Sequence, residues 1–184
     1  MIPVGYIAKR IAAQPPDWLR APSVRDVYSV SCCVNNDLVD CTPDLPINGY
    51  WLFDSPEKLR AAADAKGVDC AGSRLFYYEA CDLEFDEGEW TPFARDQSFE
   101  TSVAPPSAKH LEGFDIVSFC DGPNSHSPLS CNSIAQDVKT NEHCLFETED
   151  EARQSLNAQA FSEGEPGPYR IYAVYSVAWP RSKV

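Results

Sequence analysis

Most of the side chains that could do chemistry in this chain lie between residues 120 and 144. Thiolate and imidazole groups are zinc ligands, and a structural zinc site takes four of them in a tetrahedron. The candidate ligands are Cys120, His126, Cys131 and His143 or Cys144. The segment has no C-x-x-C and no H-x-x-x-H spacing, so turn residues and buried thiols are the competing interpretation. The main prediction is therefore no metal and no cofactor.

The same segment contains the parts of a cysteine nucleophile. Such a nucleophile needs an imidazole within hydrogen-bond reach and a third group that orients the imidazole. Cys131 or Cys120 could be the thiol, His126 or His143 the base, and Asp121 the orienting group. No familiar motif surrounds these residues, so the sequence favours a protein that is not an enzyme. An enzyme or a small-ligand-binding protein that uses this region stays open as the alternative.

A second segment combines carboxylates with aromatic rings. From Glu79 to Glu100 there are eight acidic residues and one basic residue, Arg95. Charge steers an approaching partner, and aromatic side chains supply the desolvated contact that dominates binding energy. A solvated acidic surface is the simpler interpretation. The candidate partner-binding residues are Glu84, Asp86, Glu87, Glu89, Trp90 and Phe93.

The overall charge narrows the class of partner. The formal net charge is −13 at pH 7, with 28 acidic residues against 15 basic ones. Such a field repels nucleic acid and anionic lipid and accelerates encounters with basic proteins. We therefore predict a basic protein partner, with no nucleic acid and no membrane.

The location follows from the missing targeting signals. No basic region followed by an apolar stretch opens the chain, and no segment has the 18 or so apolar residues that cross a bilayer. This pattern predicts a soluble cytoplasmic protein. In that compartment the eight cysteines would stay mostly reduced, so we expect no disulfide framework.

Three short segments recur in the same order in the two halves of the chain. This recurrence predicts a diverged internal duplication. The matched pairs are 51–60 with 144–153, 74–77 with 170–173, and 30–33 with 117–120.

Local signals place the elements of the first half. We expect strands over 24–34 and 50–53, the second after the turn signal Asn48-Gly49. A helix follows, because Ser55 is a good N-cap, Pro56 suits the first helical position and Gly67 is a stop signal. A strand over 75–85 then turns at 86–89 and returns over 90–93.

The second half repeats this pattern. We expect a strand over 114–120, a short helix over 133–139, and a helix to about Ala158 that starts with the capping box of Thr148 and Glu151. Its apolar face would be Ala152, Leu156 and Ala160 or Phe161. The longest predicted strand is 169–179.

These elements predict an α+β fold with a mostly antiparallel sheet and one main helix per repeat. The expected parts are residues 1–100 as the first repeat, 101–108 as a proline-containing linker, and 109–184 as the second repeat. We expect them to form one compact body with pseudo-twofold symmetry and a cleft between the halves.

The function that these features favour is that of a small acidic inhibitor. We expect an immunity or anti-defence type of protein that neutralises a basic partner, such as a nuclease, through its acidic and aromatic surface. The general character is similar to that of toxin-neutralising immunity proteins, although no motif of such a family is present.

Overall fold

The computed structural model describes residues 1–30, 36–37, 47–121 and 124–180. In this part of the chain the fold is mixed α+β, as predicted. Its strands form one antiparallel sheet of seven strands with the order β2-β1-β3-β7-β5-β6, and β4 pairs with β3. The strands are β1 (Ile2–Arg10), β2 (Asn36–Asp37), β3 (Arg74–Asp86), β4 (Glu89–Pro92), β5 (His110–Asp121), β6 (Asn124–His126) and β7 (Tyr169–Val177).

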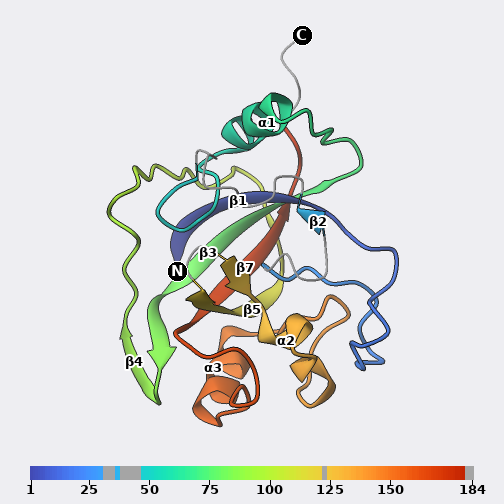
Figure 1. Cartoon of the computed structure of the whole chain (residues 1–184), viewed down its shortest axis with the longest axis vertical. Helices are drawn as coiled ribbons and strands as arrows, with labels where there is room; N and C mark the ends of the chain where they lie inside the picture. Colours follow the sequence, from blue (N-terminus) through green and yellow to red (C-terminus); the bar gives the residue numbers. More distant parts are fainter. Residues whose placement is uncertain (31–35, 38–46, 122–123, 181–184) are drawn as a thin grey trace.

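The helices pack at opposite ends of the same face of this sheet (Figure 1). They are α1 (Pro56–Ala65), α2 (Pro128–Cys131), the 3-10 turn η1 (Ile134–Gln136) and α3 (Glu149–Asn157). Leu59 of α1 packs with Tyr77 of β3, and Leu156 of α3 packs with Ile171 of β7. Tyr77 and Ile171 lie on one face because the direct cross-strand pair Tyr77–Tyr175 places residues 171, 173 and 175 of β7 on the side of Tyr77.

Both main helices begin as their sequences predict. The Ser55 hydroxyl accepts a hydrogen bond from the Lys58 backbone N–H, and Pro56 opens α1. Thr148 and Glu151 form the complete capping box of α3. Each cap satisfies N–H groups that the first helical turn would leave unpaired.

The predicted strands over 75–85, 114–120 and 169–179 are confirmed as β3, β5 and β7. Two predictions were wrong. Residues 24–30 form a loop, and the first strand is instead Ile2–Arg10. Residues 50–53 make a single bridge, from Phe53 to Tyr6, and no strand. The rest of the strand predicted over 24–34 lies outside the described residues.

The remaining predictions fail in part. The expected helix over 133–139 is reduced to the short turn η1. In the third matched pair of segments, Val30 lies in a loop whereas Val117 lies in β5, and residues 31–33 lie outside the described residues.

Two loops make the same set of contacts with β1 and β5. In the first loop, the Asn48 side chain donates to the Val4 carbonyl oxygen at 2.9 Å and its Oδ1 accepts from the Tyr50 N–H. In the second, Asn141 donates to the Glu112 carbonyl oxygen at 2.8 Å and accepts from the His143 N–H. Each loop then bridges to its strand, through Phe53 with Tyr6 and through Phe146 with Phe114.

Each docked loop lies over a glycine in a strand. Gly5 and Gly113 have φ angles of 141° and 147° and lie at register shifts of β1 and β5. A Cβ added at Gly113 would lie 2.7 Å from the Phe146 carbonyl oxygen, and one at Gly5 would lie 2.7 Å from the Phe53 carbonyl oxygen. These two positions therefore need glycine both for their backbone conformation and for the close approach of the loop.

The opposite face of the sheet packs against residues that include Tyr28 and Val30. Here the Val30 peptide is held from two sides: the Lys9 ammonium donates to its carbonyl oxygen at 3.0 Å, and its N–H donates to Asp115 Oδ2 at 2.8 Å. The Ser127 hydroxyl donates to Asp115 Oδ1 at 2.6 Å. Lys9 and Asp115 are both fully buried. Burial raises the pKa of Asp115 to about 6, and the hydrogen bonds from Ser127 and Val30 only partly oppose this effect.

Gly113→Ala should destabilise the fold by about 3 kcal/mol or more, because the new methyl group meets backbone and the φ angle is unfavourable for alanine. Gly72→Ala is the matched control, since Gly72 has φ 76° and no atom within 4 Å of an added Cβ. We expect a loss of about 1 kcal/mol there. Urea unfolding measures both, and equal losses would contradict the close approach at Gly113.

Asp115 should make the free energy of unfolding depend on pH. Because folding raises its pKa from the ordinary 3.8 to about 6, its contribution is fully present below pH 3.8 and is lost as the pH rises through 6. A shift of this size corresponds to up to about 3 kcal/mol. Asp115→Asn keeps one of the two acceptor oxygens and cannot ionise, so the stability of the wild type relative to this variant should fall between pH 4 and pH 7. A pH-independent difference would show that Asp115 does not titrate in this range.

Candidate partner-binding surface

The turn between β3 and β4 carries three exposed carboxylates. Asp86 pairs with Glu89 across the turn, and Glu87 and Gly88 between them have φ angles of 47° and 91°. Positive φ at both central residues is the geometry that suits the twist of a tight hairpin. The side chains of Asp86, Glu87 and Glu89 all reach solvent at this tip. The structure therefore brings three of the six predicted binding residues together at one exposed point.

The other three predicted residues support the hairpin from within. Glu84 accepts a hydrogen bond from Arg170 Nε of β7 at 2.8 Å, and Phe93 is buried with the Arg170 guanidinium 3.8 Å from its ring centre. Trp90 is half-buried between the hairpin and α3, where its Nε1–H donates to Asn157 Oδ1 at 3.0 Å. Glu84 and Trp90 are thus partly exposed, whereas Phe93 is buried.

A cavity of about 350 Å³ lies beside the tip, between the hairpin and the C-terminal end of α3. Sequence reasoning missed it, because its walls come from the hairpin and from residues 156–169, which are far apart in the sequence. Its lining residues are Phe85, Glu87, Gly88, Leu156, Gln159, Phe161, Ser162 and Tyr169. An apolar cavity with a carboxylate on its rim suits a side chain that has an apolar stem and a cationic head.

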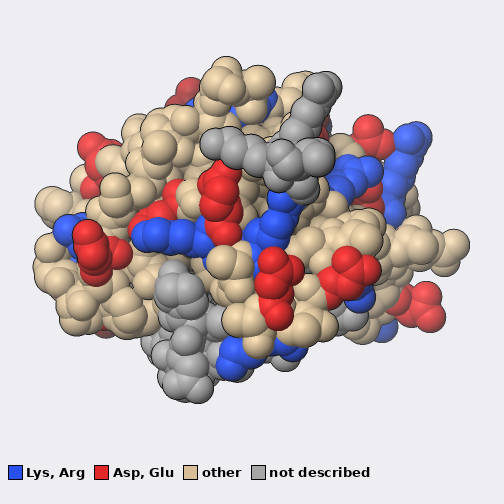
Figure 2. Space-filling view, turned by 90° about the horizontal axis from the view of Figure 1, so that it is seen from above, with Lys and Arg blue, Asp and Glu red and all other residues tan. Residues whose placement is uncertain are grey.

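The opposite end of the molecule has a different charge pattern. Figure 2 views the molecule from the end that carries α1, and acidic and basic side chains are interleaved there. At this end the Arg60 guanidinium of α1 also lies 5.0 Å from the centre of the Trp179 ring. No single-sign patch extends over the described residues in this view.

The candidate zinc ligands, which belong to the alternative interpretation, do not form a site among the residues that the structure describes. Cys131 is disulfide-bonded, so its thiolate is not available to a metal or as a nucleophile. His126 Nδ1 lies 4.0 Å from Glu165 Oε1, whereas His143 Nδ1 lies 2.5 Å from Asp26 Oδ1. Within the described ranges no group of three or more His, Cys, Asp and Glu side chains could hold a metal ion. The side chain of Cys120 lies outside them.

The Cys131 disulfide also corrects the expectation of reduced cysteines. Cys70, Cys81 and Cys144 are free thiols. Burial raises the pKa of Cys81 to about 12 and raises that of Cys144 as well. A buried thiol with a raised pKa is a packing residue rather than a nucleophile.

His143 has an oriented imidazole that the sequence did not reveal. Its ring stacks on Tyr28 at 4.1 Å, Asp26 contacts Nδ1, and Glu112 Oε2 lies 3.8 Å from Nε2. The Tyr28 N–H also donates to the His143 carbonyl oxygen at 3.1 Å. With a carboxylate near each nitrogen, this imidazole joins the loop 24–30 to the loop 141–145.

Comparison of the chain with protein families, with curated proteins and with solved structures finds no match in any of the three. In the described part of the chain, no helix is long and apolar enough to cross a membrane.

Thiol reactivity gives a direct check on the catalytic alternative. With a pKa of about 12, Cys81 is thiolate in roughly one molecule in ten thousand at pH 8. Iodoacetamide should therefore modify the half-exposed Cys70 first, and Cys81 and Cys144 only after unfolding in urea. Peptide mapping by mass spectrometry follows each site. Rapid alkylation of native Cys81 or Cys144 would instead identify a reactive thiol.

Proposed function

We propose that the protein binds a basic protein partner through the hairpin surface, which consists of Asp86, Glu87, Glu89, Trp90 and the adjoining cavity. The observation that carries this proposal is the position of three exposed carboxylates beside an apolar cavity. Carboxylates accelerate the encounter with a basic surface, and a cavity at the centre of a contact holds the side chain that dominates its energy. The net charge of −13 supports the same class of partner.

The role that suits such a surface is inhibition. A basic surface that binds phosphate groups, as in a nuclease, is blocked when an acidic protein occupies it. We propose an inhibitor of the immunity or anti-defence type on these grounds. The Cys131 disulfide is typical of an oxidising compartment. The proposal therefore does not require the cytoplasmic location that the sequence predicted.

We further propose that the two halves are diverged copies related by a pseudo-twofold axis between β3 and β7. The matching contacts of Asn48 and Asn141, and of Gly5 and Gly113, support this relation. So does the register, since Tyr6 pairs with Tyr77 where Phe114 pairs with Ala173. In this interpretation β4 and the hairpin tip are an extension of the first copy, and this extension carries the function.

The experiment begins with capture of the partner from the native host at low and at high salt, followed by kinetic measurement with the purified partner. The variant Asp86→Asn, Glu87→Gln, Glu89→Gln should slow association about tenfold or more at about 10 mM ionic strength, where the Debye length is about 30 Å. Its association rate should also depend less on salt than that of the wild type. Its folding should be unchanged, because the three side chains are exposed.

A second triple variant provides the matched control. Glu57→Gln, Asp64→Asn, Asp69→Asn removes the same charge from exposed residues at the α1 end. If the hairpin surface binds the partner, this control retains most of the association rate. Ser162→Tyr tests the cavity separately, because a ring on its rim should fill it and speed dissociation. Equal slowing by both triple variants would mean that only the net charge matters, and the hairpin surface would be the wrong site.

A further inference from the structure

The ammonium group of Lys109 lies in a cage built by the two central strands. Its Nζ is 4.0 Å from the ring centre of Tyr175, 5.2 Å from that of Tyr77, and 2.5 Å from Glu79 Oε1. Aromatic faces and a carboxylate are the groups that recognise organic cations in proteins. The cage lies on the sheet face that carries the helices.

The walls of this cage do not depend on Lys109. Tyr77 and Tyr175 are direct cross-strand partners of β3 and β7, and Glu79 follows Tyr77 on the same side of β3. The Tyr175 hydroxyl donates to Glu79 Oε2 at 3.0 Å and the Tyr77 hydroxyl to Oε1 at 3.1 Å. Burial alone would raise the pKa of Glu79, but hydrogen bonds from Lys109 and the two tyrosines outweigh it and lower the pKa. The two tyrosine hydroxyls therefore orient the carboxylate without Lys109, whereas Lys109 makes the largest contribution to keeping it ionised.

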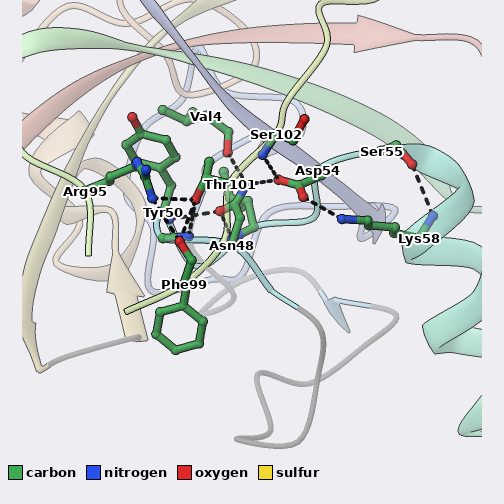
Figure 3. Close-up of polar contacts among 12 residues, drawn as sticks. Val4, Asn48, Tyr50, Asp54, Ser55, Lys58, Arg95, Phe99, Thr101 and Ser102 are labelled. Atoms are coloured by element: carbon green, nitrogen blue, oxygen red, sulfur yellow. Dashed lines mark hydrogen bonds and ion pairs between the residues drawn. The ribbon is translucent and has the colours of Figure 1, made fainter. Parts of the chain in front are cut away.

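The chain that supplies Lys109 has other anchors. Figure 3 shows that Thr101 and Ser102, which precede Lys109 in the chain, are hydrogen-bonded to the 48–54 loop. Thr101 Oγ1 accepts from the Gly49 N–H at 2.9 Å, and the Ser102 N–H donates to Asp54 Oδ1 at 3.2 Å. After it, His110 pairs with Ser176 of β7. Because both flanks are held independently, the Lys109 side chain can leave the cage without unfolding the backbone.

We infer that Tyr77, Tyr175 and Glu79 form a binding site for a primary alkylammonium group, which Lys109 fills from within the same chain. A primary ammonium is favoured because it donates a hydrogen bond to Glu79, whereas a quaternary ammonium has no N–H to donate. The competing ligand is a lysine side chain of another protein or a free alkylamine. In either case the ligand must displace Lys109.

The test empties the cage and refills it. In Lys109→Ala, n-butylammonium, which has the four-carbon stem of lysine, should bind saturably and shift the ring resonances of Tyr77 and Tyr175 in NMR spectra. Wild-type protein should require at least about tenfold more ligand, because its own lysine competes at a high effective concentration. Butyltrimethylammonium should bind at least about tenfold more weakly than n-butylammonium. Lys66→Ala, which removes an exposed lysine at the α1 end, should behave as the wild type.

Two outcomes would overturn the inference. The first is the absence of saturable shifts in Lys109→Ala, and the second is an unchanged affinity in Lys109→Ala with Glu79→Gln. N-acetyl-lysine methylamide distinguishes the two sources: binding of both ligands indicates a site for protein lysines, and binding of butylammonium alone indicates a free amine.

A further measurement does not need the alanine variant. In the wild type, the ε-methylene protons of Lys109 should resonate upfield because of the Tyr175 ring, and excess n-butylammonium should move them back. Unshifted ε-methylene protons would show that Lys109 does not occupy the cage.

Discussion

The fold depends on two places where a loop backbone comes within van der Waals distance of a strand backbone. A side chain on the strand at either place would keep them apart, so Gly5 and Gly113 are required there. The approach allows Asn48 and Asn141 to bond across the gap, and each asparagine also closes its own loop. The N-cap of a helix follows seven residues later in each case, at Ser55 and Thr148. The positions of α1 and α3 on the sheet are thus set by these two contacts.

On the other face of the sheet, buried polar groups determine where the loop 24–30 packs. A buried lysine and a buried aspartate are unfavourable unless their hydrogen-bonding groups find partners. Lys9 and Asp115 both find a partner in Val30: Lys9 donates to its carbonyl oxygen, and Asp115 accepts from its N–H. An apolar loop could pack on an apolar sheet in several positions. The hydrogen bonds of Lys9 and Asp115 to Val30 form in only one of these positions. Burial of Asp115 is unfavourable for its ionised form, and its hydrogen bond from the Val30 N–H gives the loop 24–30 a defined position.

Local signals allowed α1, α3 and the hairpin to be predicted from the sequence, because caps and tight turns are determined within a few residues. The first strand was missed because Pro3 and Gly5 resemble strand breakers, whereas Gly5 is the residue that the bulge needs. Residues 24–30 were mistaken for a strand because Val24, Val27, Tyr28 and Val30 are apolar, a property that comes from their burial in the core. For the candidate binding surface too, only the features determined by neighbouring residues could be predicted. The exposed tip could be predicted, but the roles of Glu84 and Phe93 depend on Arg170, which lies far away in the chain.

The strand order has a consequence for how the chain assembles during synthesis. β7 is the last strand of the described chain, yet it lies at the centre, between β3 and β5. A nascent chain that has not yet released residues 169–177 therefore holds two partial sheets, each with a long unpaired edge. Unpaired edges are templates for association with other chains. The order of the strands thus leaves the β3 and β5 edges unpaired until residues 169–177 are available, and the pairing of β7 is the step that joins the two partial sheets.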